Sequence, residues 1–552
     1  MRVLVDVLIP VHNAAETIQE TVKSALEQSI PNYLRNESRN GTESHVHDSY
    51  SRISLKEVHI DIAICCQDDG SEDDSLKILK NIQRSLLTKS TTLQEGTVHE
   101  CDRHELTYQL FIGSDRNAGA GAARNRASFL RSKMNPTPNH LSDTSLYFIC
   151  LLDSDDIMHP HRIAHQVAVM LALSKEDRNS TLLGSNFNRI PANSTWHYTE
   201  WANALTDERL ILEKFREITI LQPTWMMTKA RFKQLGGYIE ASHLDQLVSK
   251  SKEKIDCQAY KLVHPRYDTP QTLRLAEDLR LFYAHLSYPY LVKGNAAMND
   301  SASNIAPGKL KMIRTKEPLL TYRHREGQSQ SSSTPRKLLL QLRVKAFEDL
   351  ILCNKSRMKT SWLSTVESEG FIIWGAGRDG KAFFKSLGDD VKKCVRCFVD
   401  VDEKKISNGY YVVPKDKACS ANVSRPKVKE CFKVPIIHFS LIASGCEARK
   451  ELMNEWIHNQ HEDNDIVAGR ITKNRKKQCK PLKKRQKTEG EPKRILHAIS
   501  KKDKENMEMI ETGVLTKLPV VVCVAMYRTN GVLEKNVEKI GRCEGVDLWH
   551  FS

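Results

Sequence analysis

The chain has 552 residues, of which 40% are hydrophobic and 27% are charged, enough to bury the cores of two or more domains. It contains no apolar run of roughly 18 residues, so we expect no membrane span. The formal net charge is +15, but residues 470–506 hold 15 Lys and Arg against 4 Asp and Glu, or +11 of that total. A specific nucleic-acid partner is therefore not expected.

The basic stretch 470–506 is poor in aromatic and β-branched residues, a composition that predicts disorder. It belongs to a longer insert, residues 444–517, which we expect to be disordered. Residues 470–506 could contact a polyanion or direct the chain to the nucleus, and the simpler interpretation, a solvated loop, is favoured. The 14 cysteines form no spaced framework, and the first ten residues are interrupted by Asp6 and do not form a signal peptide. We therefore expect a cytoplasmic protein.

Strand and helix patterns alternate from the N-terminus. Residues 3–12 are near-continuously apolar and predict a strand, and residues 14–29 carry apolar side chains at helical spacing. The same succession recurs at 59–87 and 106–132, and a fourth apolar strand ends in the acids of "LLDSDD". This alternation predicts βαβ units and an α/β fold with a mostly parallel sheet.

Polar clusters follow each of the four predicted strands. They occupy residues 10–13, 68–71, 117–125 and 153–156. Because ligands of parallel sheets bind at the carboxyl ends of the strands, these clusters indicate one site. Taken singly, each has a plainer explanation: an acidic turn that ends a strand, a capped helix start at 69–73, or an ordinary glycine-rich turn.

The residue types suggest a chemistry for this edge. Asp153 and Asp155 are expected on one face of a strand end, where a hard divalent cation could take carboxylate oxygens. Asp69 can accept a hydrogen bond from the imide N–H of a base such as uracil. Gly119 lets backbone approach a ligand, and Arg124 is a fork-shaped donor for phosphate or carboxylate.

Four segments in this order, "IPVHNAAETIQETVKSALEQS", "DDGSEDDS", "RNAGAGAARN" and "LLDSDDIMHPHRI", resemble the family 2 glycosyltransferases. These are inverting nucleotide-sugar enzymes of the GT-A fold, and the resemblance covers residues 1–330. It implies a UDP-sugar donor, with Mn²⁺ or Mg²⁺ held by Asp155, Asp153 near the ribose or nucleotide, and Asp69 against the uracil; the strand-end pattern makes Asp153 a second candidate metal ligand. The resemblance and the strand-end pattern together give the nucleotide-sugar-binding candidates Pro10, His12, Asn13, Asp69, Gly119, Arg124 and Asp153.

The acceptor side is indicated by "QPTWMMTKARFKQLGGYIE" and "LRLAEDLRLFYAHL". In the resemblance the second segment supplies the general base, which matches Asp278, with Glu277 beside it. Without the resemblance, these acids are simply common residues for a helix N-terminus. No Gln-x-x-Arg-Trp run follows, so processive polymer synthesis is not expected.

More narrowly, both halves are similar to the animal β-1,3-N-acetylglucosaminyltransferase-like proteins, which implies transfer of N-acetylglucosamine to an acceptor that the sequence does not identify. Polar expansions at 32–54 and 241–270, and the basic insert, depart from that pattern.

The second half predicts a helical linker at 331–366 and a small Rossmann-like domain made of 367–443 and 518–552. A GxGxxG run begins at Gly375 after a strand, and Asp400 or Asp402 ends the next strand at the spacing of a ribose contact. No hydride-transfer residues are visible. A dinucleotide-dependent oxidoreductase, a nucleotide-binding adaptor and a structural module all remain open for this half. The lone CxxC at Cys394 and Cys397 lacks a second pair, and we expect no metal there.

Overall fold

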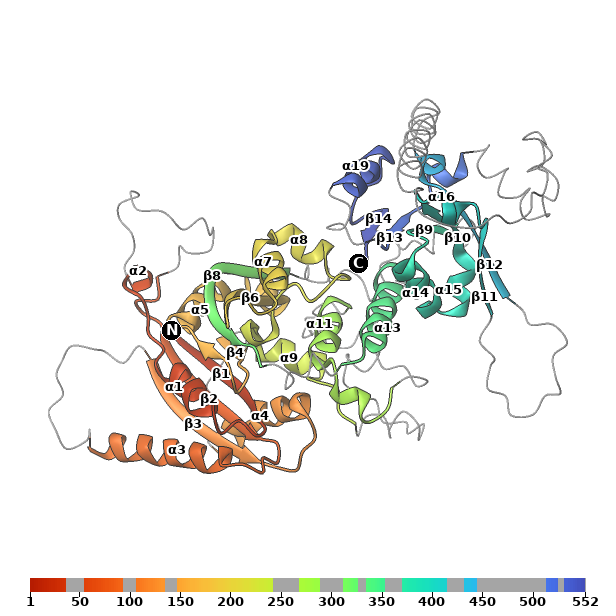
Figure 1. Cartoon of the computed structure of the whole chain (residues 1–552). Coiled ribbons are helices and arrows are strands. Elements are labelled where there is room, and N and C mark those ends of the chain that lie inside the picture. The colour runs from red at the N-terminus through yellow and green to blue at the C-terminus, as the bar shows by residue number, and fades with distance from the viewer. Residues whose placement is uncertain are drawn as a thin grey trace, which may run out of the picture. The chain divides into compact units, whose positions relative to one another are not determined.

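The computed structural model describes eleven stretches of the chain: residues 1–35, 54–92, 106–134, 146–241, 268–287, 311–325, 334–352, 370–414, 431–443, 513–524 and 531–551. Contacts divide the chain into two units, 1–346 and 347–552, which are described one at a time (Figure 1). The division falls within the linker expected at 331–366. The basic stretch 470–506 lies outside the described residues.

The first unit is built on an eight-stranded sheet with the order β3-β2-β1-β4-β7-β6-β8-β5. Strands β3, β2, β1 and β4 are parallel, as is the β6–β8 pair, whereas β7 runs antiparallel to both neighbours and β5 antiparallel to β8. The sheet is thus mixed beyond its first four strands. The strands are β1 (Arg2–Val11), β2 (His59–Asp68), β3 (Leu106–Ser114), β4 (Tyr147–Leu151), β5 (Ile157–Met158), β6 (Thr181–Ile190), β7 (Met226–Thr228) and β8 (Lys311–Arg323).

Helices connect and cover these strands (Figure 1). They are α1 (Ile18–Leu26), α2 (Asn32–Arg35), α3 (Ser75–Thr92), α4 (Ala120–Met134), α5 (Arg162–Ala172), α6 (Lys175–Asn179), α7 (Trp196–Ala204), α8 (Asp207–Leu212), α9 (Lys229–Leu235), α11 (Glu277–Ser287) and α13 (Arg336–Phe347). Short 3₁₀ turns lie at η2 (Gln222–Thr224) and η4 (Thr272–Arg274).

The two faces of β1 follow from its alternating side chains. Val3, Val5 and Val7 are fully buried in one core cluster, which also holds the apolar positions of α1. The opposite face packs against α4, where Asp6 is fully buried and its Oδ1 lies 2.8 Å from Arg131 Nε. A strand buried on both faces is near-continuously apolar, as the sequence indicated.

Strand register brings the polar clusters together. Val11 of β1 pairs with Asp68 of β2, Asp68 pairs with Ser114 of β3, and Leu8 pairs with Leu151 of β4. All four strands therefore end at one edge, and the residues that follow them lie side by side.

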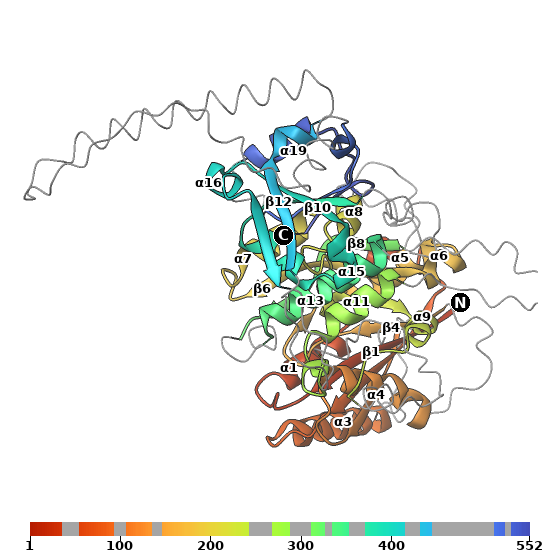
Figure 2. The ribbon, with the colours of Figure 1, turned by 90° about the vertical axis from the view of Figure 1, so that its right-hand side faces the viewer.

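The second unit contains a six-stranded sheet with the order β11-β12-β10-β9-β13-β14, parallel except for β11. Figure 2 shows β10 and β12 next to each other. The strands are β9 (Phe371–Trp374), β10 (Val395–Asp400), β11 (Tyr410–Pro414), β12 (Cys431–His438), β13 (Val520–Val522) and β14 (Leu548–His550). The helices are η5 (Glu348–Leu352, a π-helix), α14 (Arg378–Ser386), α15 (Asp389–Cys394), α16 (Glu403–Ile406), η7 (Phe439–Ile442), η8 (Val514–Thr516) and α19 (Val532–Lys539).

One expected boundary needs correction. The insert was expected to extend to residue 517, yet η8 is ordered and Leu515 is 4% exposed within the core of the second unit. The apolar pair Val514 and Leu515 explains this, since burying apolar surface favours the folded state. Residues 444–512 of the expected insert lie outside the described residues.

In the second unit, Asp400 accepts a hydrogen bond from the backbone of the glycine-rich turn. Gly375 has a φ of +109°, and a Cβ on Gly380 would lie 1.9 Å from the carbonyl oxygen of Gly375. Asp400 accepts from the N–H of Ala376 at 2.8 Å and from Lys405 Nζ at 3.1 Å. The carboxylate expected to contact a ribose is therefore occupied within the unit. Asp402, the other candidate, accepts from Lys404 N–H and caps α16.

Within the described stretches, no helix combines the length and the hydrophobicity needed to cross a bilayer.

Candidate functional site

The strand-end clusters line a cavity of about 930 Å³ in the first unit. The lining comes from two stretches of chain. We call the lining residues between Pro10 and Asp155 the first wall, and those between Glu217 and Leu339 the second wall. All ten candidate residues lie in these walls: Pro10, His12, Asn13, Asp69, Gly119, Arg124, Asp153, Asp155, Glu277 and Asp278.

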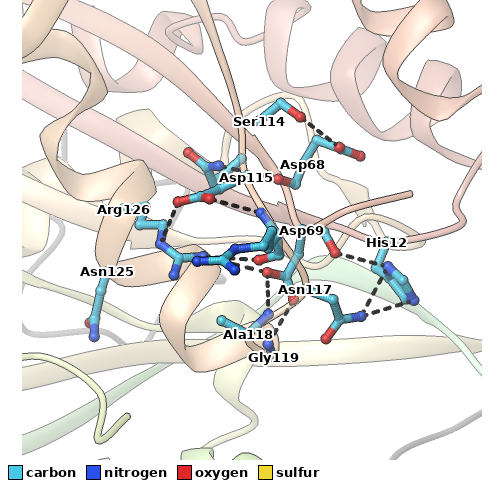
Figure 3. A network of polar contacts seen from close by, with 12 residues as sticks. His12, Asp68, Asp69, Ser114, Asp115, Asn117, Ala118, Gly119, Asn125 and Arg126 are labelled. Atoms are coloured by element: carbon cyan, nitrogen blue, oxygen red, sulfur yellow. Dashed lines mark hydrogen bonds and ion pairs between the residues drawn. The ribbon is translucent and has the colours of Figure 1, made fainter. Parts of the chain in front are cut away.

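Asp69 ties two segments of the first wall together (Figure 3). Its Oδ1 accepts from the N–H of Ala118 at 2.8 Å, and its Oδ2 accepts from the N–H of Gly119 at 2.7 Å. The turn that presents it needs Gly70, whose φ is +74°. Because a carboxylate has about four lone-pair positions, these two bonds leave capacity for a further donor.

A second polar group flanks Asp69. A ring nitrogen of His12, Nδ1, lies 3.1 Å from the Asp69 carbonyl oxygen, and Asn117 Nδ2 lies 3.3 Å from His12 Nε2 (Figure 3). Arg274, from the second wall, donates to Asn117 Oδ1 at 3.0 Å. Asn13, with a φ of 49°, accepts from Glu72 N–H through its Oδ1. The polar end of β1 is thus fixed to both neighbouring loops.

The acids of the segment "LLDSDD", Asp153, Asp155 and Asp156, lie in the turn that follows β4. Strand β4 ends at Leu151, so Asp153 and Asp155 follow the strand rather than alternating within it, although both still line the cavity. Burial, and then the charge of Asp153, raises the pKa of Asp155 to about 6. Asp156 points elsewhere: it is fully buried, and burial followed by the charges of its two acidic neighbours raises its pKa well above the usual range.

Arginines from distant segments oppose this negative charge. Arg323 donates its backbone N–H to Asp156 Oδ1 at 2.9 Å, and Arg325 Nε lies 3.4 Å from Asp155 Oδ2. Neither arginine was identified from the sequence. The available signal was the basic "YRHR" at the end of β8, which no local pattern connects with residues 153–156.

Arg124 joins the two walls. Its Nη2 donates to Asp153 Oδ1 at 2.5 Å and its Nη1 to Glu277 Oε1 at 3.1 Å, and the side chain is 3% exposed. The guanidinium also lies 5.4 Å from the ring centroid of Tyr238. This side chain was expected to serve as a fork for a ligand phosphate, but here its two terminal nitrogens bind protein carboxylates.

Asp278 has a different environment from Glu277. It lies in the first turn of α11, partly buried, and accepts from the N–H of Leu279 at 2.7 Å. Burial, and then the charge of Glu277, raises the pKa of Asp278 to about 7; Arg124 opposes this shift and Glu217 adds to it. Of the two adjacent acids, Glu277 is paired with an arginine, and Asp278 is the one whose pKa is raised toward neutral.

The carboxylates suit a metal only in part. Asp153 and Asp155 expose 26% and 29% of their side chains, and their mutual repulsion is what a divalent cation would relieve. Among the described residues there is no group of three or more His, Cys, Asp or Glu that could hold a metal ion. These two acids therefore fit a cation that takes its remaining oxygens from a bound ligand or water.

No family model matches the chain. Among solved structures, the chain is similar to Staphylococcus aureus TarS 1-349 in complex with UDP-GlcNAc, at 14% identity and a TM-score of 0.31, over 62% of this chain and 66% of that one. S. aureus TarS in a second structure gives 12% identity and a TM-score of 0.32 over 71% of this chain and 50% of that one. The chain thus spans about two thirds and one half of these two proteins. A likeness at this TM-score establishes neither the fold nor the activity of this chain.

Proposed function

We propose that the first unit is an inverting glycosyltransferase that moves a sugar from a UDP-sugar to an acceptor hydroxyl. One observation carries the proposal: the residues that follow four parallel strands and the start of α11 line a single cavity, to which β2, β4 and α11 bring acids. The order of the sequence motifs supports the same reaction class. N-acetylglucosamine is the sugar that the narrower sequence resemblance favours.

The first wall would bind the donor. Asp69 keeps lone pairs for the imide N–H of uracil while its bonds to Ala118 and Gly119 hold it in place. Pro10, His12 and Asn13 would flank the nucleoside. Arg323 and Arg325 lie where they could contact the diphosphate, because both line the cavity beside Asp155.

Asp155 and Asp153 would hold Mn²⁺ or Mg²⁺, and such an ion, when bound, neutralises the charge that develops on the leaving diphosphate. The chain's own contribution is to orient these two carboxylates. Arg124 fixes Asp153 through Nη2, and Arg325 lies beside Asp155.

The rest of the second wall, around the start of α11, would bind the acceptor, and Asp278 would be its base. The carboxylate takes the proton of the acceptor hydroxyl as that oxygen attacks the anomeric carbon from the face opposite UDP. The bond from that carbon to the diphosphate breaks in the same step, so an α-linked donor gives a β-linked product. A base is most effective when its pKa lies near the working pH, and the pKa of Asp278, at about 7, meets that requirement.

The test is a panel of UDP-sugars incubated with the full chain and Mn²⁺, with release of UDP as the readout. We expect one sugar, N-acetylglucosamine first among the candidates, to be hydrolysed or transferred in a metal-dependent manner. Calorimetry with UDP and with NAD(H) separates this proposal from the oxidoreductase alternative. Binding of NAD(H) without binding of UDP would overturn it.

No observation favours that alternative over the transferase, because Asp400 in the second unit already accepts from the backbone N–H groups of Ala376, Val401 and Asp402 and from Lys405 Nζ, which fills the roughly four acceptor positions of a carboxylate.

A further inference from the structure

A second cavity lies in the first unit, between α4 and α9, and has a volume of about 750 Å³. It shares no described lining residue with the first cavity. Its size falls in the range of roughly 300–1,000 Å³ that suits small organic ligands. Its lining includes Phe129, Tyr147, Lys229, Phe232, Lys233 and Glu240.

The floor of this cavity carries excess positive charge. Beneath it, the fully buried Asp6 lies 2.8 Å from Arg131 Nε and 2.9 Å from Lys229 Nζ, and accepts from the hydroxyl of Tyr147 at 2.7 Å. The single carboxylate of Asp6 is therefore paired with two cations, Arg131 and Lys229, in a buried place where an uncompensated charge is costly.

Lys229 retains a donor for a ligand. An ammonium group has three N–H donors, and Lys229 uses one on Asp6 Oδ2 and one on the Tyr147 hydroxyl at 2.8 Å. No described residue accepts the third. Because Lys229 lines the cavity, that donor is available to a molecule bound there.

Lys233 adds a second cation one helical turn along α9. Positions i and i+4 of a helix are neighbours, so both ammonium groups border the same space. Within the described residues, Lys233 has no acidic partner. The cavity's one carboxylate, Glu240, already accepts from Asn125 Nδ2 at 2.8 Å. Lys229 and Lys233 thus bring two positive charges to one cavity, which favours an anion there.

Aromatic side chains line the cavity as well. Phe129 of α4 is still 49% exposed there, and Phe232, on the same helix as the lysines, is buried. An aromatic ring held half in water loses the free energy that burial would give it. A flat apolar group placed on Phe129 would recover part of that free energy.

We propose that this cavity binds a small organic anion with a flat apolar body, such as an aromatic carboxylate or sulfonate. The acid group lies between Lys229 and Lys233, and the body lies on Phe129. The site is separate from the one assigned to glycosyl transfer and does not depend on that assignment.

Fluorescence titration of the full chain tests the proposal with two probes of one shape. Anilinonaphthalene sulfonate carries the acid group, and N-phenylnaphthylamine is the same body without it. We expect one sulfonate probe to bind per chain. In Lys233→Met its affinity should fall at least tenfold, with little change for the neutral probe, whereas Phe129→Ser should weaken both. Lys77→Met, at an exposed lysine of α3, is the matched control and should change neither.

Two results would overturn the proposal. The first is equal affinity for the sulfonate in Lys233→Met and Lys77→Met, which would show that Lys233 does not bind the sulfonate group. The second is displacement of the probe by UDP with Mn²⁺, which would place the probe in the first cavity. Lys233 and Phe129 are both exposed enough to be replaced without removing a core side chain, so folding is not the limiting issue.

Discussion

Arg124 donates to Glu277 at 3.1 Å although the two residues are 153 positions apart in the sequence. The contact links α4 to the first turn of α11, and Glu277 is 8% exposed there. It separates two adjacent acids by environment: Glu277 neutralises a buried guanidinium, and Asp278 is left to exchange a proton. The neighbouring negative charge of Glu277 contributes to the raised pKa of Asp278.

Replacing Asp278 by Asn should lower kcat by roughly 10²–10⁴-fold, the usual contribution of a general base, with little effect on UDP binding. Asn keeps the shape of the side chain, so packing around α11 is preserved. Steady-state kinetics and UDP calorimetry on the same preparation provide the measurement. Turnover equal to wild type would remove Asp278 from the mechanism.

The pH profile of kcat/KM should rise through a pKa of about 7, because the base must be ionised to accept a proton. Two substitutions should move that limb in opposite directions. Arg124→Gln removes a positive charge that favours the carboxylate, and should shift the limb upward by about one pH unit. Glu277→Gln removes the opposing negative charge and should shift it downward.

Together, Arg124→Gln and Glu277→Gln test whether Arg124 acts on the pKa of Asp278 or binds the donor substrate. If Arg124 instead holds the diphosphate, its loss should raise KM for the donor and leave the acidic limb where it was. A shift of both variants in the same direction would contradict the electrostatic account of Asp278.

Asp155→Ala should abolish the Mn²⁺-dependent part of UDP binding while the protein still folds, since the side chain is 29% exposed and carries little packing. The matched control is Asp74→Ala in the turn after β2, whose side chain is 68% exposed. Calorimetry with Mn²⁺ and with EDTA measures the difference. UDP binding that is equally metal-dependent in Asp155→Ala and wild type would show that the metal is held elsewhere.

In the second unit, Gly380→Ala should destabilise by about 1–3 kcal/mol, because the new Cβ would meet the Gly375 carbonyl oxygen at 1.9 Å. Gly377→Ala is the control: its Cβ would meet only Lys405 Nζ, at 3.9 Å. Thermal unfolding followed by circular dichroism should show a lowered transition for the first variant alone. Equal melting of the two would contradict the close packing of the glycine-rich turn.

Deleting residues 470–506 should leave the proposed transferase activity unchanged and reduce retention on a heparin column, because this stretch carries +11 of the formal charge. A loss of activity or solubility would instead show that the stretch packs on the fold or contacts substrate.

The sequence was informative where a local pattern determines a position. Apolar runs, near-continuous in β1, identified β1 to β4, and since parallel strands share an edge, the sequence predicted one site for Asp69 and Asp153. The same reasoning put residues 153–155 inside a strand, but β4 ends at Leu151. Boundaries depend on which backbone groups find partners, and here the partner strand β7 is only three residues long.

Contacts between distant segments were not predictable in this way. The hydrogen bond from Arg323 to Asp156 spans 167 positions, and no periodicity connects the two. Similarly, no sequence pattern indicated that the Asp69 carboxylate accepts hydrogen bonds from the backbone N–H groups of Ala118 and Gly119. Such pairs form because buried charges and backbone donors must be satisfied, a requirement that identifies the need for a partner and not its position.

The two walls of the first cavity do not interleave along the chain: one ends at Asp155 and the other begins at Glu217. A single genetic crossover between these points would pass on one wall whole and replace the other. The two parts would still have to fit in the sheet and core that they share, and within the cavity the charge pairs Arg124 with Glu277 and Arg325 with Asp155 would have to match. Selection on such recombinants would therefore act on those charge pairs as well as on packing.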